Sequence, residues 1–101
     1  MKALPASILV IEPHPLMREA LCLAIETAEG LRVAAQACDG TQALEILPTL
    51  PADIILFSLG NPGWDDLQTI AALHRAWSWI PILALTANEV PEQEQAALAR
   101  G

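Results

Sequence analysis

The sequence predicts an α/β fold, in which a doubly wound parallel sheet carries helices on both faces. Two unbroken apolar runs of strand length, Ile8 to Ile11 and Ile54 to Phe57, are typical of parallel strands that are buried on both sides. Segments with helical apolar spacing alternate with these and two further strand-like segments along the chain. Strict alternation with short connections implies parallel strands joined by right-handed crossovers.

Length and composition indicate one domain over residues 1–101 and narrow the class of protein. No polar-free window approaches the length of a membrane span, and Met1 to Pro5 lacks the apolar core of a signal peptide. We therefore expect a cytoplasmic protein with no membrane partner. The net charge is -7 and there is no basic stripe, which argues against binding of DNA or RNA by this segment itself. Cys22 and Cys38 lack metal-binding spacing, and both are expected to be small buried side chains.

A run of apolar residues, a break at two prolines and a segment of helical apolar spacing predict the first strand and the helix that follows it. Ser7 to Glu12 is the strand, and Glu12-Pro13-His14-Pro15 ends it. Pro15 suits the first turn of a helix, where its missing N–H costs nothing. From Leu16 to about Ala28 apolar residues recur at helical spacing, and Gly30 stops the helix. Its core-facing positions are predicted to be Leu16, Ala20, Leu21, Ala24, Ile25 and Ala28, with Met17 and Leu23 broadening the stripe.

A weaker strand and a short helix follow. Leu31 to Ala37 alternates weakly, which is typical of a less buried strand near a sheet edge. Asp39, followed three residues later by Gln42, resembles a capping box, and the helix that it starts cannot pass Pro48. One face of the strand is predicted to hold Leu31, Val33, Ala35 and Ala37, and the helix to turn Ala43, Leu44 and Leu47 inward.

The central strand is predicted from Asp53 to Leu59 and is expected to be buried on both faces. Its apolar run stops at Ser58, and the turn residues Gly60 to Gly63 follow. Asp65 or Asp66 can begin a third helix. The apolar positions of this helix are Leu67, Ile70, Ala71, Leu73 and Trp77.

A fourth strand, Ile80 to Leu85, ends at Thr86, and a fourth helix is predicted from about residue 88 to residue 101. The small size of this β-α-β-α-β-α-β-α chain favours the flavodoxin-like strand order. In such a sheet, chemistry lies just past the carboxyl ends of the strands. Ser58 therefore occupies the position where this fold would keep its key functional group.

At this point the chain resembles the receiver domains of two-component response regulators, of the NarL/FixJ type that precedes a LuxR-type helix-turn-helix. The resemblance covers essentially the whole chain. It is carried by Ile8 to Leu21 with the run His14-Pro15-Leu16-Met17-Arg18, by Asp53 to Gly63, and more weakly by Asp39 to Leu44 and Ala84 to Ala87. It implies a receiver (CheY-like) fold that lacks its last strand and helix in this chain.

The departures from the family pattern concern its chemistry. Receivers carry two adjacent acids that hold Mg²⁺, and here those positions are Glu12 and Pro13. The phosphoacceptor position is Ser58, the switch hydroxyl matches Thr86, and the family's lysine has no counterpart. Mg²⁺ needs hard oxygen ligands, which proline lacks and a neutral hydroxyl supplies poorly. Acyl-phosphate formation needs a carboxylate nucleophile. We therefore expect no aspartyl phosphorylation, no bound metal and no cofactor.

The sequence thus favours a non-enzymatic pseudo-receiver that acts as a protein–protein interaction or dimerisation module of a signalling or transcriptional regulator. Its partner would be another protein or a second copy, with DNA bound only through a domain outside this chain. One alternative is a phosphorylation-competent receiver that uses a non-standard acid. Another is a small hydrolase in which Ser58 acts with His14 and Glu12. The nucleophile-elbow pattern is not met, because position 56 is leucine.

Apolar side chains near the end of the chain predict an association surface. Ile80 to Leu85 is expected to be an exposed apolar edge strand, and the helix face at Leu16, Leu21 and Ile25 to lack part of its cover. Of the three tryptophans, Trp77 is predicted to lie in the core. Trp64 and Trp79 are near turns, where exposure would indicate a contact surface. For Trp79 we favour the alternative, a plug at the base of the fourth strand.

Overall fold

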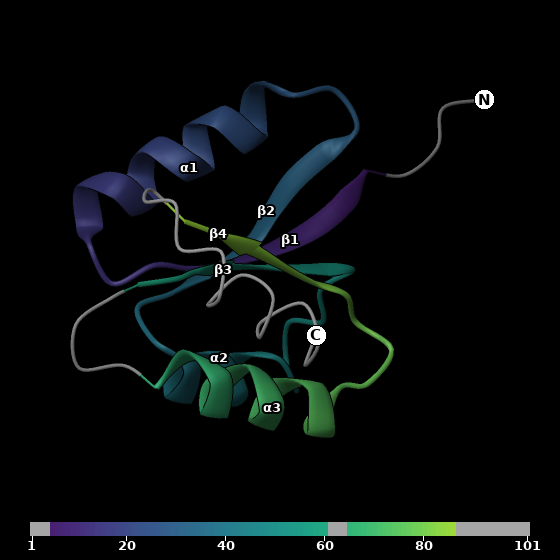
Figure 1. Ribbon diagram of the computed structural model, residues 1–101. Coiled ribbons are helices and arrows are strands. Elements are labelled where there is room, and N and C mark those ends of the chain that lie inside the picture. The colour runs from purple at the N-terminus through teal and green to yellow at the C-terminus, as the bar shows by residue number, and fades with distance from the viewer. Residues whose placement is uncertain (1–4, 61–64, 87–101) are drawn as a thin grey trace.

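The computed structural model describes residues 5–60 and 65–86 of the chain. Within these ranges strands and helices alternate as predicted (Figure 1). The elements are β1 (Ala6–Ile11), α1 (Pro15–Thr27), β2 (Leu31–Ala37), α2 (Gly40–Ile46), β3 (Ile54–Ser58), α3 (Asp66–Ala76) and β4 (Ile82–Leu85). The predicted fourth helix and Trp64 lie outside the described residues. None of the described helices is long and apolar enough to cross a membrane.

The strands form one parallel sheet in the order β2-β1-β3-β4, which is the predicted flavodoxin-like order. Helix α1 covers one face of the sheet, and α2 and α3 cover the other (Figure 1). β2 lies at an edge, as its weak alternation predicted. Because all the strands run the same way, their carboxyl ends meet at one edge of the sheet.

Strand β1 is the most deeply buried element. Its residues from Ser7 onward are all buried, and they divide between two apolar clusters. Leu9 and Ile11 point into the larger cluster under α2 and α3, while Ile8 and Val10 point toward α1. The prediction of burial on both faces is therefore right for β1. It is wrong for β3, in which Ile55 and Phe57 are buried but Ile54, Leu56 and Ser58 are half-buried. The reason is that α1 packs over β1 and β2 rather than over β3.

A β-bulge in β2 changes which side chains share a face. Ile8 pairs with Val33, but the next β1 residue, Leu9, pairs with Ala35, so that Ala34 is the extra residue. Leu31 and Val33 therefore pack on the α1 side, whereas Ala35 and Ala37 pack on the opposite side. The predicted single face for these four residues is wrong, because one inserted residue reverses the alternation.

Helix α1 begins at Pro15 as predicted, but it buries a narrower face than its sequence suggests. Only Cys22 and Ile25 are buried in it, and Leu21 packs against them. Leu16 is 80% exposed and Leu23 is 68% exposed. Leu16 was predicted to face the core, and so were the exposed Ala20, Ala24 and Ala28. The correction follows from helix geometry, since Leu16 lies nearly opposite Ile25 at 100° per residue.

Near the end of the described chain, Trp77 lies where it was predicted, whereas Trp79 takes the exposed position instead of the favoured buried one. Trp77 is half-buried and packs against the larger cluster. Trp79 is 73% exposed, and Ile80 fills the base of β4 in its place. Leu83 and Leu85 are exposed on β4, as expected of an apolar strand at the edge of the described sheet.

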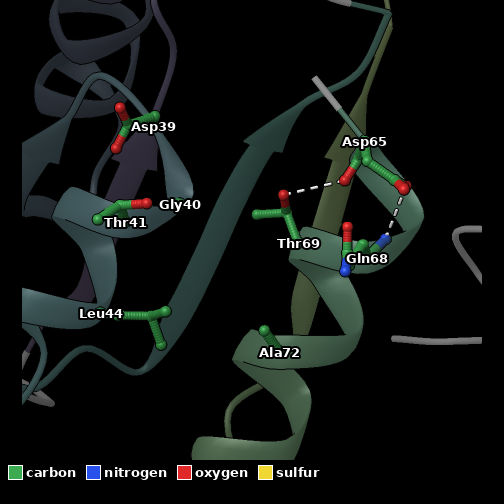
Figure 2. A pocket seen from close by; sticks show the side chains of 8 residues that line it. All are labelled: Asp39, Gly40, Thr41, Leu44, Asp65, Gln68, Thr69 and Ala72. Carbon is green, nitrogen blue, oxygen red and sulfur yellow. Dashed lines mark hydrogen bonds between the residues drawn. The ribbon is translucent and has the colours of Figure 1, made fainter. Parts of the chain in front are cut away.

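Helices α2 and α3 approach each other closely at Gly40, the first residue of α2. A methyl group at this position would clash with Cγ2 of Thr69 in α3. Figure 2 shows the two residues on neighbouring helices. The Thr69 hydroxyl donates to the carbonyl oxygen of Asp65 at 2.9 Å, which fixes the orientation of the side chain. Glycine is therefore needed here for space.

We predict that Gly40→Ala lowers the free energy of unfolding by about 1–3 kcal/mol, the usual cost of overpacking. Thr69→Ser removes Cγ2 and keeps the hydroxyl, so Gly40→Ala should cost clearly less in that background. Urea unfolding followed by circular dichroism measures both, with Thr69→Ser alone as the control. An equal cost in the two backgrounds would show that the Thr69 methyl group is not the obstacle.

Candidate functional site

The carboxyl edge of the sheet brings together most of the residues that the sequence singled out. Glu12 directly follows β1, Ser58 ends β3 and Thr86 directly follows β4. The register places Ile11 beside Phe57 and Ser58 beside Leu85. Glu12 and Ser58 therefore occupy equivalent positions on adjacent strands, one residue beyond the paired Ile11 and Phe57. The strands therefore bring Glu12, Ser58 and Thr86 to the same edge of the sheet.

Glu12 is a buried carboxylate, with 1% of the residue exposed. Its Oε1 lies 2.7 Å from Nδ1 of His14, whose side chain is 64% exposed. The backbone N–H of His14 also points to Oε1, at a longer 3.4 Å. The other carboxylate oxygen, Oε2, has no hydrogen-bond partner among the described residues. One oxygen of the Glu12 carboxylate, Oε1, is thus in contact with His14, and the other is not.

The start of α1 holds this pair in place. His14 is the N-cap residue of α1, and Pro15 fixes the backbone of the first turn. One turn on, Arg18 donates from Nη1 to the carbonyl oxygen of Glu12 at 2.8 Å. Arg18 and His14 therefore bind the backbone and the side chain of the same residue. From the sequence, His14 and Glu12 were named together only in the hydrolase alternative, and a direct contact between them was not predicted. The spacing Glu12-x-His14 at a strand end was a usable signal for this contact.

A second buried acid lies near the end of β3. Asp66 is 6% exposed, and its Oδ2 accepts the backbone N–H of Gly60 at 2.9 Å. Gly60 has a positive φ of 81°, which glycine adopts without strain. The sequence left open whether Asp65 or Asp66 caps α3. The structure assigns that role to Asp65, whose Oδ1 accepts from the N–H of Gln68. Asp66 instead holds the backbone N–H of Gly60, two residues after the end of β3.

An open hollow of about 560 Å³ lies between the N-terminal halves of α2 and α3. Figure 2 shows the residues of the two helices around it, including the N-cap residues Asp39 and Asp65. The carboxylates of both aspartates accept N–H groups of their own helices. The two acidic side chains beside the hollow therefore serve as helix caps, and for Asp39 this agrees with the predicted capping box.

The two cysteines differ in their surroundings. Cys22 is buried as expected, and burial raises the pKa of its thiol, so that the protonated form predominates. Cys38 is exposed, which contradicts the prediction of a second buried cysteine. It follows β2 directly, and its N–H donates to Oε1 of Gln42 at 2.6 Å, so the capping-box glutamine holds the chain at this point.

Comparison with known proteins identifies the family. The model of the response regulator receiver domain matches residues 8–101, and the chain therefore belongs to this family. The four parallel strands with helices on both faces agree with its fold.

Two relatives and two solved structures illustrate the similarity. The chain is 31% identical over 100 residues to the nitrate/nitrite response regulator protein NarP of Escherichia coli K12, and 32% identical over 97 residues to NarL of the same organism. These matches take in 99% and 96% of this chain but 46% and 45% of the relatives, so the chain spans less than half their length.

Among solved structures, the receiver domain of the putative response regulator NarL from Mycobacterium tuberculosis has a TM-score of 0.82 at 29% identity. That match covers 98% of this chain and 80% of the other. A LuxR-family response regulator from Aurantimonas sp. SI85-9A1 has a TM-score of 0.87 at 25% identity, over 96% of this chain and 69% of the other.

The donors at the carboxyl edge can be compared with what Mg²⁺ requires. Among residues 5–60 and 65–86, no three His, Cys, Asp or Glu side chains are grouped so that they could hold a metal ion. Pro13 offers no side-chain ligand, Ser58 offers a neutral hydroxyl, and Oε1 of Glu12 is engaged by His14. The residues present do not fit a magnesium ion that prefers one or two free carboxylates.

We predict that His14→Ala lowers the free energy of unfolding by about 1–3 kcal/mol, because the buried Glu12 carboxylate loses its side-chain partner. The His14 side chain makes no capping bond to α1, so the substitution tests the contact with Glu12. In a Glu12→Gln background the buried group is neutral, and the loss should be smaller. Denaturant unfolding of the four proteins gives the coupling energy. Strictly additive effects would contradict a direct interaction between the two side chains.

Proposed function

We propose that this receiver domain works without aspartyl phosphorylation, as a protein-interaction module of a two-component-type signalling or transcriptional regulator. The observation that carries the proposal is the residue at the carboxyl end of β3. There the chain has the hydroxyl of Ser58, level with Glu12 on the adjacent strand. In the family this position supplies the carboxylate that accepts the phosphoryl group.

The chemistry of a hydroxyl at this position supports the proposal. A carboxylate can attack a phosphoryl donor directly and form a labile acyl phosphate. A serine hydroxyl needs a neighbouring base and would form a stable ester, which does not act as a reversible switch. We infer that Ser58 fills the phosphoacceptor position as a polar residue, and that Thr86 keeps the position of the switch hydroxyl without a phosphoryl group to bind.

The remaining carboxylate is already committed to a contact within the chain. Glu12 is buried and bound to His14, and Arg18 holds its carbonyl group. The contact with His14 occupies Oε1 and leaves Glu12 only Oε2 to offer to a cation, and Pro13 adds no second ligand. This arrangement supports a domain whose carboxyl edge is stabilised by protein contacts in place of a metal ion.

An interaction role is supported by the apolar side chains that the described fold leaves exposed. Leu16 and Leu23 on α1, and Leu83 and Leu85 on β4, are all solvent-accessible. Exposed apolar surface of this kind marks contact sites on proteins. In this proposal the regulator is of the LuxR type, and its DNA contacts belong to a domain outside these 101 residues, because the net charge of -7 disfavours DNA binding here.

One observation favours a second candidate, a small hydrolase. The Glu12–His14 pair has the form of the acid and base of a catalytic triad, and Ser58 ends the strand next to Glu12. The absence of a nucleophile elbow around Ser58 weighs against it. A fluorophosphonate probe discriminates between the two, because a hydrolase would be labelled at Ser58 and an interaction module would not.

We predict that the protein gains no phosphoryl group when it is incubated with acetyl phosphate and Mg²⁺ and its intact mass is measured. Ser58→Asp alone should remain unmodified, because Pro13 still removes a metal ligand. The triple change Glu12→Asp, Pro13→Asp and Ser58→Asp is the better candidate for gain of phosphorylation, and it serves as the positive comparison.

A labile phosphoryl group on the unaltered protein would instead support the alternative of a receiver that uses a non-standard acid. The same modification on the Ser58→Asp variant would show that Glu12 suffices as the metal ligand. Calorimetric titration with Mg²⁺ gives an independent measurement, for which we expect no saturable binding that depends on Glu12.

A further inference from the structure

The outer edge of β2 has a composition that favours pairing with another strand. In the order β2-β1-β3-β4, β1 pairs with one edge of β2, and no strand of the described residues pairs with the other. β2 has the sequence LRVAAQA, with one charged side chain and no proline. Charged side chains and prolines are common means by which proteins keep an exposed edge from pairing. An edge of this kind pairs with strands of other chains unless another feature covers it.

Two backbone hydrogen bonds show which residues present their N–H groups to this free edge. The carbonyl oxygen of Gly30, just before β2, accepts the N–H of Ala6 at 2.9 Å, so Gly30 points toward β1. The carbonyl oxygen of Ala37 accepts the N–H of Glu12 at 3.0 Å, so Ala37 points the same way. Alternate residues of a strand point their peptide groups to opposite edges, and the bulge at Ala34 adds one residue to the count. The outward row is therefore Leu31, Val33, Gln36 and Cys38.

Side chains from the two neighbouring helices occupy two positions of this row. In the last turn of α1, Oε1 of Glu26 accepts the N–H of Val33 at 2.9 Å. In the first turn of α2, Oε1 of Gln42 accepts the N–H of Cys38 at 2.6 Å. Both bonds lie on the exposed side of the strand. The free edge is thus covered near its start by one helix and just past its end by the other.

Neither side chain is explained by the needs of its own helix. A carboxylate in the last turn lies next to the negative end of the helix dipole, yet Glu26 is there and α1 has no basic residue in this turn. The N-cap of α2 is already formed by Asp39, whose Oδ1 accepts the N–H of Gln42. Water could also satisfy the exposed N–H groups of Val33 and Cys38. A tethered side chain differs from water because an incoming strand has to push it aside.

We propose that Glu26 and Gln42 close the outer edge of β2 against pairing with the same edge of a second copy of this chain. With both acceptors in place, the N–H groups of Val33 and Cys38 are occupied, and the bulge at Ala34 interrupts the row between them. Without the acceptors, two β2 edges pair antiparallel about a twofold axis and join two sheets into one. This inference concerns a mode of association that the fold suppresses, and it does not rest on the proposed function.

The test compares loss of the acceptors with their retention in the complete protein. The pair Glu26→Ala and Gln42→Ala removes both, whereas the pair Glu26→Gln and Gln42→Glu keeps a side-chain oxygen at each position and the same net charge. Sedimentation velocity over a wide range of concentration should show self-association of the alanine pair about tenfold tighter than that of the unaltered protein, which corresponds to about 1.4 kcal/mol. The acceptor-retaining pair should show no such gain. Glu29→Ala, which removes an exposed charge between α1 and β2, should behave as the unaltered protein.

Amide hydrogen exchange followed by NMR shows where the association takes place. In a dilute solution of the alanine pair, the N–H groups of Val33 and Cys38 should exchange faster than in the unaltered protein, because they have lost their acceptors. At concentrations where the pair associates, these amides and that of Gln36 should become protected. Circular dichroism checks that each variant is folded. Should the pair unfold, the single variants Glu26→Ala and Gln42→Ala give the same two measurements at one position each.

Faster exchange at Val33 and Cys38 without self-association would overturn the proposal, since the two contacts would then have no protective role. Association that leaves the amides of β2 unprotected would also overturn it and assign the contact to another surface. An unaltered protein that pairs through these amides would show that the edge is open. The measurements contain no phosphodonor and change no residue at the carboxyl edge of the sheet. Their outcome is therefore independent of whether the domain is phosphorylated.

Discussion

The burial of β1 is the constraint on which the rest of this structure depends. An unbroken apolar strand satisfies its backbone only by pairing on both sides, and it keeps its side chains from water only if both faces are covered. β2 and β3 provide the pairing, α1 covers one face, and α2 and α3 cover the other. Because β1 is buried up to its last residue, the side chain that follows it, Glu12, is carried into the interior as well.

A buried carboxylate has to be compensated, and here the compensation comes from the helix that follows it. His14 contacts the Glu12 side chain and Arg18 holds its carbonyl group, so the end of β1 and the first turn of α1 form one connected unit. This connection uses the one basic residue of α1 at the sheet edge. The outer face of the same helix is left with exposed apolar and acidic side chains.

The fold does not depend on a cluster of carboxylates at the sheet edge. Carboxylates that share a small site repel one another, and a metal ion usually offsets this repulsion. At this edge Glu12 and Asp66 are the buried acids of the described residues, and Asp66 accepts the backbone N–H of Gly60. A single histidine then supplies the side-chain contact to Glu12. The sheet itself does not require acids at this edge, because its two clusters are built from apolar residues and Ser58 keeps its place in the register beside Leu85.

The sequence by itself determined the order of the elements, the parallel sheet, the start of α1 at Pro15, the cap at Asp39 and the grouping of Glu12 and Ser58 at one edge. These follow from local rules, since apolar period, proline and capping residues act within a few positions of the chain. Only the tertiary structure decided which apolar residues are buried. The bulge at Ala34 reversed the faces of β2, and the position of α1 over β1 and β2 left Leu16 and Leu23 in solvent. It also decided that Glu12 is paired with His14, and that Asp66 reaches Gly60 while Asp65 caps α3. Such choices depend on which segments meet in space, and a pattern read along the chain holds no information about the partner that a given face will find.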